Sequence, residues 1–154
     1  MMRRGIVASA VLVASFANGS VRAEQPYLEG RFDIVMKESH WAGEPPLVDA
    51  FWVFEKDDGK TRRSHLVHYR KDGRLNVGYY DNTPYDGKMY WLNDWYRESN
   101  TMIDRNTFSY EYELQMAGMP QPLSGKGLCK INEPRTRISC TIGGSVEVYE
   151  KKGK

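Results

Sequence analysis

The feature that most constrains the fold is a regular alternation of apolar and polar side chains over residues 107–116. Every second residue is apolar, and these are Phe108, Tyr110, Tyr112, Leu114 and Met116. The residues between them are polar, namely Ser109, Glu111, Glu113 and Gln115. A period of two predicts an extended strand that buries one face and exposes the other, as strands of antiparallel sheets do.

Other segments give the same signal, and none has the 3.6-residue period of a convincing helix. A first strand is expected near Gly30–Lys37. Its apolar face holds Phe32, Ile34 and Met36. A second strand is expected over Leu47–Glu55, where residues 51–54 are consecutively apolar. Because neighbouring residues point to opposite faces, this strand should be covered at least in part on both sides.

Turn signals separate these runs. Three evenly spaced triplets combine Asp, Gly and a basic residue, at 58–60, 72–74 and 86–88. Asp-Gly between alternating runs is a strong hairpin signal, because tight hairpin turns need positive φ. Further turns are expected at Asn93-Asp94, Arg105-Asn106 and Gly143-Gly144, and Ala117–Gly127 is predicted to be the one long irregular loop.

The pattern predicts an all-β domain, an antiparallel meander of roughly eight to ten short strands. A strand order that follows the chain is typical of a small barrel or of a two-sheet β-sandwich. Closure removes exposed sheet edges, and this favours the barrel.

The N-terminal segment predicts export. Residues 1–23 combine the basic pair Arg3-Arg4, an apolar run over Ile6–Ala17 and a small-residue end at Ala23, which is the composition of a cleaved secretory signal peptide. The run is shorter than the roughly 20 residues of a membrane span. We therefore expect a single β-barrel-like domain over residues 24–154, in a periplasmic or secreted protein.

The net charge of the chain without its leader argues against some classes of binding partner. Without Arg3, Arg4 and Arg22, the chain keeps 19 Lys and Arg against 20 Asp and Glu, a net charge of −1. An evenly mixed surface argues against nucleic acid, which requires a concentrated basic patch. No second long apolar run follows residue 23, so no membrane span is predicted in the mature protein.

Two cysteines, Cys129 and Cys140, would meet an oxidising compartment after export, where thiols usually pair. Residues 128–142 form a natural hairpin about Glu133–Thr136, and both cysteines are then equidistant from the turn. We predict a disulfide across this hairpin that stabilises the fold by about 3 kcal/mol. No C-x-x-C motif is present, so a catalytic cysteine is not predicted.

Two short motifs resemble known groups of proteins. Gly30-Arg31-Phe32 resembles the Gly-x-Trp opening of lipocalins and related calycin barrels, with Phe in place of Trp. That resemblance implies a ligand-holding, lipocalin-like barrel. Ile103-Asp104-Arg105-x-Thr107, with the later Gly127-x-Cys129, resembles a pattern of small uncharacterised exported bacterial proteins, which implies a periplasmic origin and no particular activity.

Aromatic residues supply the candidate site. Seven Tyr and Trp residues gather between positions 79 and 96. They suit flat organic ligands or a protein interface, although aromatic residues also fill the interior of small β domains. The predicted ligand-binding residues are Trp52, Tyr79, Tyr90, Trp91, Tyr110 and Tyr112.

No residue set predicts catalysis, a metal site or a cofactor. His65 and His68 are three apart on a strand, and therefore on opposite faces, while His40 lies in a loop. Glu111 and Glu113 share one strand face, which would suit glycoside hydrolysis if that face lined a polar barrel interior, but it is more simply the solvated side.

The leading hypothesis is a non-enzymatic exported barrel that binds a small apolar or aromatic ligand. The alternative is a protein-interaction module, an inhibitor or an envelope-assembly factor whose partner is an envelope protein. That alternative would use the Ala117–Gly127 loop with Met116 and Met119, together with three aromatic residues expected to point outward, Tyr80, Trp95 and Tyr96.

Overall fold

A computed structural model describes residues 26–153 of the chain. The predicted signal peptide, residues 1–23, lies outside the described residues. The strands are β1 Gly30–Ile34, β2 Leu47–Asp57, β3 Thr61–Arg70, β4 Leu75–Pro84, β5 Tyr90–Trp91, β6 Tyr96–Asp104, β7 Thr107–Leu114, β8 Leu123–Ile131, β9 Arg137–Ile142 and β10 Ser145–Lys151. The helical content of this region is one 3₁₀ turn, η1 Met36–Glu38, and it holds no helix that could cross a membrane.

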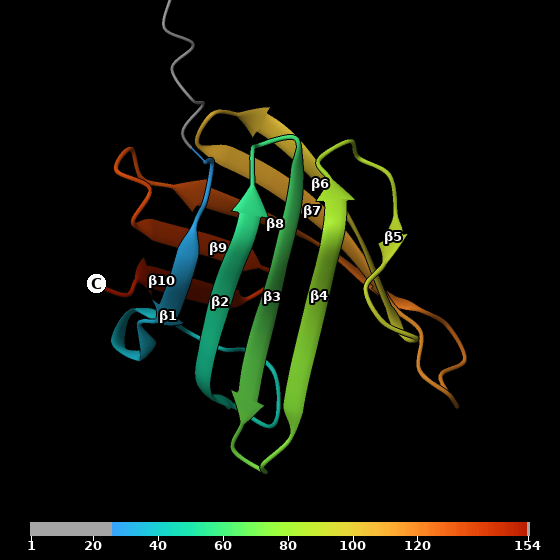
Figure 1. The fold of residues 1–154 in the computed structure, drawn as a ribbon. Helices are drawn as coiled ribbons and strands as arrows, with labels where there is room; N and C mark the ends of the chain where they lie inside the picture. Colours follow the sequence, from blue (N-terminus) through green and yellow to red (C-terminus); the bar gives the residue numbers. More distant parts are fainter. Residues whose placement is uncertain (1–25, 154) are drawn as a thin grey trace, which may run out of the picture.

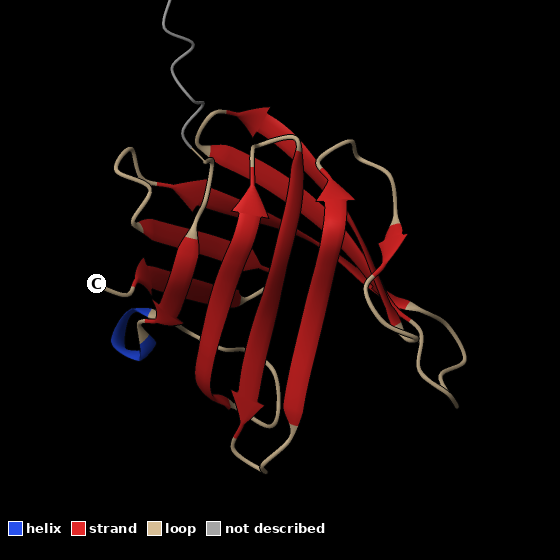
Figure 2. Ribbon diagram, in the orientation of Figure 1, coloured by secondary structure: helices blue, strands red, loops and turns tan. Residues whose placement is uncertain are grey.

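All ten strands belong to one antiparallel sheet in the order β4-β3-β2-β1-β10-β9-β8-β7-β6-β5. The first and last strands, β1 and β10, pair with each other, so the sheet curls into a nearly closed barrel. In Figure 1, β1–β4 form one wall and β6–β10 run across behind them. The predicted all-β barrel is confirmed. The sandwich alternative is wrong, because the strands form a single continuous sheet (Figure 2).

Two of the three Asp-Gly triplets form the predicted hairpins. Gly59 and Gly73 have φ of 80° and 87° and turn β2 into β3 and β3 into β4. Gly87 also has positive φ, but its N–H donates to the carbonyl of Asn100 at 2.9 Å. The third triplet therefore makes no hairpin, and it leads the chain from β4 across to β6.

β-bulges on both neighbours of β3 set which side chains face inward. Opposite Arg63, β2 places two residues, and β4 also places two. The inward residues of these strands therefore step by three at this point. As a result Asp57 and Thr83 point into the barrel, on either side of the inward Arg62, and all three are buried.

The core fills one end of the barrel with aromatic rings. Phe32, Phe54 and Phe108 are at most 2% exposed. Phe32 meets Phe54 edge-on with ring centroids 5.5 Å apart, and Trp52 stacks on Phe54 at 4.8 Å. Edge-on and offset contacts are the favoured geometries of aromatic pairs, so this end of the barrel is closely packed.

The predicted disulfide is present. Cys129 on β8 and Cys140 on β9 are directly opposite in the ladder and are bonded. The hairpin between these strands turns where expected, and Arg135 adopts a positive φ of 56° within it. Both cysteines are buried against the core, so the bond ties two barrel strands together.

Three predicted boundaries were wrong. The first strand ends at Ile34, because residues 36–38 form η1, and Met36 is 42% exposed. The Thr107–Met116 strand ends at Leu114. The long loop is shorter than expected, because β8 already begins at Leu123 and pairs residues 123–127 with β7.

The barrel wall is interrupted between β4 and β6. β4 is one edge of the sheet and the two-residue β5 is the other. At one end of this interruption a bridge joins Asp86 to Thr101. Elsewhere no ladder joins these strands within residues 26–153, and in Figure 1 β5 stands apart from β4.

Candidate functional site

The barrel holds a partly open cavity of about 400 Å³. Its walls come from both sides of the barrel and from the loop that holds Trp41 and Gly43. Eight aromatic side chains line it: Trp41, Trp52, Tyr80, Trp95, Tyr96, Phe108, Tyr110 and Tyr112. Four charged or ionisable side chains also contribute: His68, Arg70, Glu98 and Glu147. A concave, mainly aromatic space with a few convergent polar groups is the usual form of a small-molecule site.

The cavity reaches the interruption in the wall. On one side it is lined by Asn76, Val77 and Gly78 of β4, and on the other by Asn93 and Trp95. Val77 pairs with Val67 on the outer face of β3, yet it lines the cavity as well. The cavity therefore reaches the unpaired edge of β4, where no ladder closes the wall.

Two glycines of β8 make room for two tyrosines. Gly127 is opposite Tyr110, and Gly125 is opposite Tyr112. A Cβ added to Gly127 would lie 2.1 Å from the Tyr110 ring, and one added to Gly125 would lie 2.5 Å from the Tyr112 ring. The rings lie directly against the β8 backbone, which only glycine permits, and this widens the space between β7 and the opposite wall.

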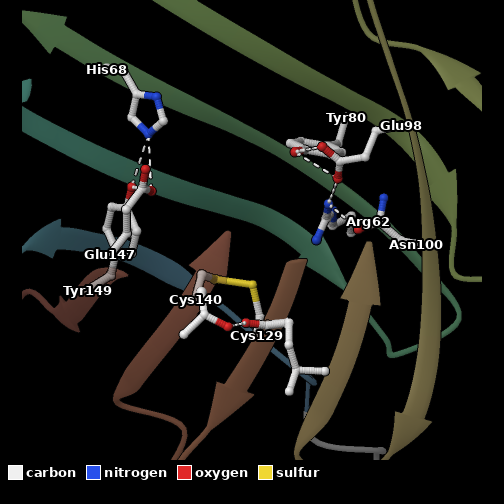
Figure 3. Close-up of a disulfide and its surroundings, with 11 residues drawn as sticks. Arg62, His68, Tyr80, Glu98, Asn100, Cys129, Cys140, Glu147 and Tyr149 are labelled. Carbon is white, nitrogen blue, oxygen red and sulfur yellow. Dashed lines mark hydrogen bonds and ion pairs between the residues drawn. A yellow bond between two sulfur atoms is a disulfide. The ribbon is translucent and has the colours of Figure 1, made fainter. Parts of the chain in front are cut away.

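Glu98 lies in a buried polar cluster (Figure 3). Its oxygens accept hydrogen bonds from the hydroxyls of Tyr80 at 3.2 Å and Tyr96 at 2.5 Å, and from Arg62 at 3.4 Å. Arg62 also donates to Asn100 at 2.9 Å. Burial raises the pKa of Glu98 above its ordinary value, although Arg62 and the hydroxyl donors act in the opposite direction. Both carboxylate oxygens are engaged, and the cluster bridges β3 and β4 to β6.

Arg62 is 1% exposed and lies among aromatic rings. Its guanidinium carbon is 3.8 Å from the centroid of the Tyr80 ring and 5.1 Å from that of Trp52. Burial lowers the pKa of Arg62, but the surrounding Tyr85, Tyr80 and Glu98 groups outweigh it and raise that pKa. Arg62 thus stays cationic, stabilised by cation–π contacts and acidic neighbours.

A second carboxyl lies at the same end. Asp57 accepts a hydrogen bond from the hydroxyl of Tyr85 at 2.7 Å and another from the N–H of Gly59 at 2.9 Å. Burial raises the pKa of Asp57 to about 6, against the lowering effect of these two donors and of Arg62. Neither Asp57 nor Arg62 lines the cavity. This end of the barrel is therefore filled by buried polar groups around Asp57 and Arg62, which together we call the plug.

Glu147 forms a different cluster at another part of the cavity wall (Figure 3). Its Oε2 accepts a hydrogen bond from the hydroxyl of Tyr149 at 2.5 Å and lies 3.3 Å from Nε2 of His68. The same His68 nitrogen is 3.2 Å from the Tyr149 hydroxyl. Burial raises the pKa of Glu147, but the charge and hydrogen bond of His68, then Tyr149 and Arg70, outweigh it and hold that pKa below its ordinary value.

Comparison of this chain with protein-family models, curated proteins and solved structures gives no match. The site must therefore be interpreted from its own geometry.

The six predicted ligand-binding residues divide into two groups. Trp52, Tyr110 and Tyr112 line the cavity. Tyr79 is on the outer face of β4 and is 61% exposed, and Trp91 is 57% exposed. Tyr90 donates its hydroxyl to Asp86 at 2.8 Å and also lies outside the cavity. The structure therefore brings together only the first three.

The expectation that Tyr80, Trp95 and Tyr96 point outward was wrong, because all three line the cavity. Tyr80 is opposite the inward Ser64 and is 5% exposed. Two adjacent aromatic residues break the alternation of apolar and polar side chains, so the sequence does not show which of them points inward. The register with β3 decides which member of the Tyr79-Tyr80 pair is inside.

The carboxylates weighed for hydrolysis lie outside the barrel. Glu111 pairs with Lys126 at 2.9 Å and Glu113 with Arg97 at 2.6 Å, and neither lines the cavity. His65 and His68 occupy opposite faces of β3, as expected. Among residues 26–153, no three His, Cys, Asp or Glu side chains gather in a way that could hold a metal ion.

Sequence reasoning missed the buried charged residues, Arg62, Glu98 and Glu147. Each interrupts an otherwise strand-like segment. In β10, Glu147 and Tyr149 alternate with Val146 and Val148, and the apolar pair would have been assigned to the inside. Val148 is instead buried on the outer face, where its N–H donates to Ser39 Oγ at 3.0 Å next to η1.

Proposed function

We propose that this protein binds a small, flat and largely apolar molecule inside its barrel, without chemical conversion. The observation that carries the proposal is the cavity of about 400 Å³ lined by eight aromatic side chains. Protein interiors are close-packed and tolerate few voids larger than a water molecule. A space of this volume lies within the range of small-molecule sites, roughly 300–1,000 Å³.

Other features support the same proposal. Gly125 and Gly127 keep the tyrosines of β7 flat against the wall, an arrangement that preserves space where larger residues would fill a core. The resemblance of Gly30-Arg31-Phe32 to the lipocalin opening agrees with a ligand-holding barrel. The predicted leader and the Cys129–Cys140 disulfide support a periplasmic or secreted location for this binding.

Gly78 offers a direct test, because it lines the cavity and has room for a side chain. A Cβ at Gly78 would meet only Tyr80, at 3.9 Å, and the backbone there is ordinary strand. The Gly78→Phe variant should place a ring inside the cavity with little strain. The matched control is Leu75→Phe on the same strand, where Leu75 faces outward and is 53% exposed.

The reporter is the neutral dye N-phenylnaphthylamine, which fluoresces strongly when it leaves water. We expect the unsubstituted protein and Leu75→Phe to bind the dye alike, and Gly78→Phe to bind it at least about tenfold more weakly. Native mass spectrometry of the gently purified protein should also show a retained mass that Gly78→Phe lacks. If the unsubstituted protein neither binds the dye nor retains a mass, the proposed function is wrong.

A further inference from the structure

The two oxygens of Glu147 are used unequally. Oε2 receives the hydroxyl of Tyr149 and faces Nε2 of His68. Within residues 26–153, Oε1 has no hydrogen-bond partner. A buried carboxylate normally fills its acceptor positions, so the free oxygen requires an explanation.

Glu147 lines the cavity, and its Oε1 keeps some accessible surface. Glu147 is 7% exposed and is part of the cavity lining. Oε1 is not among the polar atoms that are both sealed from solvent and without a partner, such as Nε1 of Trp41. Since Oε1 is neither sealed nor bonded, and since Glu147 lines the cavity, a molecule bound there could donate to it.

The charged residues of the lining indicate which charge a bound molecule would carry. Both oxygens of Glu98 already accept hydrogen bonds, from Tyr80, Tyr96 and Arg62. Two basic side chains also belong to the lining. Arg70 stacks its guanidinium on the Trp41 ring at 4.2 Å and donates to the carbonyl of Pro45 at 3.3 Å, and His68 faces Oε2 of Glu147, the oxygen that is already engaged. Of the two carboxylates in the lining, Glu147 is therefore the one with an oxygen that accepts no hydrogen bond within the described residues.

The aromatic rings around the cavity also favour a positively charged ligand group. The face of an aromatic ring attracts cations, and a carboxylate among several rings is the arrangement that holds organic ammonium groups. Tyr110 lines the same cavity, and burial, followed by the charges of Glu147 and Glu98, raises the pKa of its hydroxyl. Its ring therefore lies near both carboxylates, where a cation would complement them.

We propose that the ligand carries a protonated amine on a flat aromatic or apolar body, and that the amine donates to the free Oε1 of Glu147. The inference rests on the proposed function and names the chemical class of its ligand. The body lies among the rings of Trp52, Tyr110 and Tyr112, and the ammonium lies at the Glu147 end of the cavity.

The test compares three probes with the same ring and different end groups: tryptamine, tryptophol and indoleacetate. Their affinities for the purified protein are measured by isothermal titration calorimetry at neutral pH. A charge-assisted hydrogen bond should make tryptamine bind about tenfold more tightly than tryptophol. Indoleacetate should bind most weakly, because its carboxylate would face Glu147.

The Glu147→Gln variant keeps the shape of the side chain and removes its charge. We expect this change to bring the affinity for tryptamine to within about threefold of that for tryptophol. The matched control is Glu111→Gln on the outer face of β7, a side chain that pairs with Lys126. The control should retain the full preference for the amine.

The outcomes separate this inference from the proposed function. If tryptophol or indoleacetate binds as tightly as tryptamine, or if Glu147→Gln keeps the preference, the amine is not recognised at Glu147. If no probe binds but the neutral dye does, the inference fails and the proposed function stands. If the dye does not bind either, both fail. If Glu147→Gln does not fold, the ranking in the unsubstituted protein still tests the amine, because a ranking without a preference for the amine overturns the inference.

Discussion

Glu98 and Glu147 are two buried carboxylates on the wall of one barrel, and both are partnered by the inner face of β3. Arg62 reaches Glu98, and His68, six residues along the strand, reaches Glu147. That spacing is roughly 20 Å in an extended chain. Glu98 has donors on both oxygens, whereas Glu147 has donors on one.

This difference in hydrogen bonding indicates that the two buried carboxylates have different roles. The Glu98 cluster spans the interruption between β4 and β6, where no ladder joins these strands, so its hydrogen bonds hold the wall together. The Glu147 cluster lies within β10 and opposite β3, where the wall is already continuous. Its hydrogen bonds orient the carboxylate rather than close the barrel. Stability should therefore depend mainly on the first cluster and ligand selectivity on the second.

The largest effect is expected from Arg62→Met. Removing the guanidinium leaves Glu98 buried without its cation, and breaking a buried ion pair typically costs 3–5 kcal/mol, so we expect a loss of about 4 kcal/mol in the free energy of unfolding. Urea denaturation measures this loss. The neighbouring Arg63→Met is the control, because its side chain is 59% exposed on the outer face, and it should change stability by less than about 0.5 kcal/mol.

The double variant Arg62→Met with Glu98→Gln extends the same experiment. It should recover part of the loss, because no buried charge then remains unpaired. Equal destabilisation by Arg62→Met and Arg63→Met would contradict the structural role of the Glu98 cluster.

A smaller effect should come from Asp57, the other buried carboxyl near Arg62. Its pKa is about 6 in the folded state against 3.8 ordinarily. The folded state therefore holds its proton more tightly, and stability falls as pH rises from about 4 to 6. Two pKa units correspond to about 2.7 kcal/mol, so we expect this carboxyl to lower stability by about 2 kcal/mol across that range.

Asp57→Asn isolates this contribution, because all other carboxyls remain in both proteins. Thermal unfolding is measured at a series of pH values. As the pH rises, the free energy of unfolding should fall by about 2 kcal/mol more in the unsubstituted protein than in the variant. Parallel pH profiles would show that the carboxyl titrates at its ordinary pKa and that the plug does not perturb it.

The smallest effect is expected from Tyr149→Phe, which removes one donor from Glu147 and leaves Oε1 untouched. Loss of a buried hydrogen bond should cost about 1 kcal/mol of unfolding free energy. Tyr79→Phe is the control, since the Tyr79 side chain is 61% exposed. Chemical denaturation and the three indole probes measure the two properties separately. The preference for tryptamine should survive, and its complete loss would assign selectivity to Tyr149 rather than to Oε1.

The sequence predicts the fold well where alternation is unambiguous. In β7 the apolar set from Phe108 to Leu114 faces inward as expected, because each neighbour is polar. In β4 the adjacent Tyr79 and Tyr80 are equally apolar, and a bulge at residues 81–82 changes the inward spacing. The side each ring faces then depends on pairing with β3, which no local pattern contains.

The candidate site was only half predictable for a related reason. Trp52, Tyr110 and Tyr112 follow from the apolar pattern. Glu147 does not, because the valines beside it are covered on the outside by η1 and its approach, residues 35–39. A strand buried on both faces loses the contrast that distinguishes inside from outside, and a charged residue on it is easily assigned to solvent.

The interruption of the wall beside the cavity bears on how quickly a bound molecule could enter and leave. In a fully closed barrel, passage through the wall requires ladder hydrogen bonds to break, and such opening is slow. Between β4 and the loop that holds Trp95 there is no ladder to break. Passage there would depend on the rearrangement of side chains, and exposed side chains rotate in picoseconds to nanoseconds. The residence time of a bound molecule would then be set by its contacts inside the cavity and not by the unfolding of the wall.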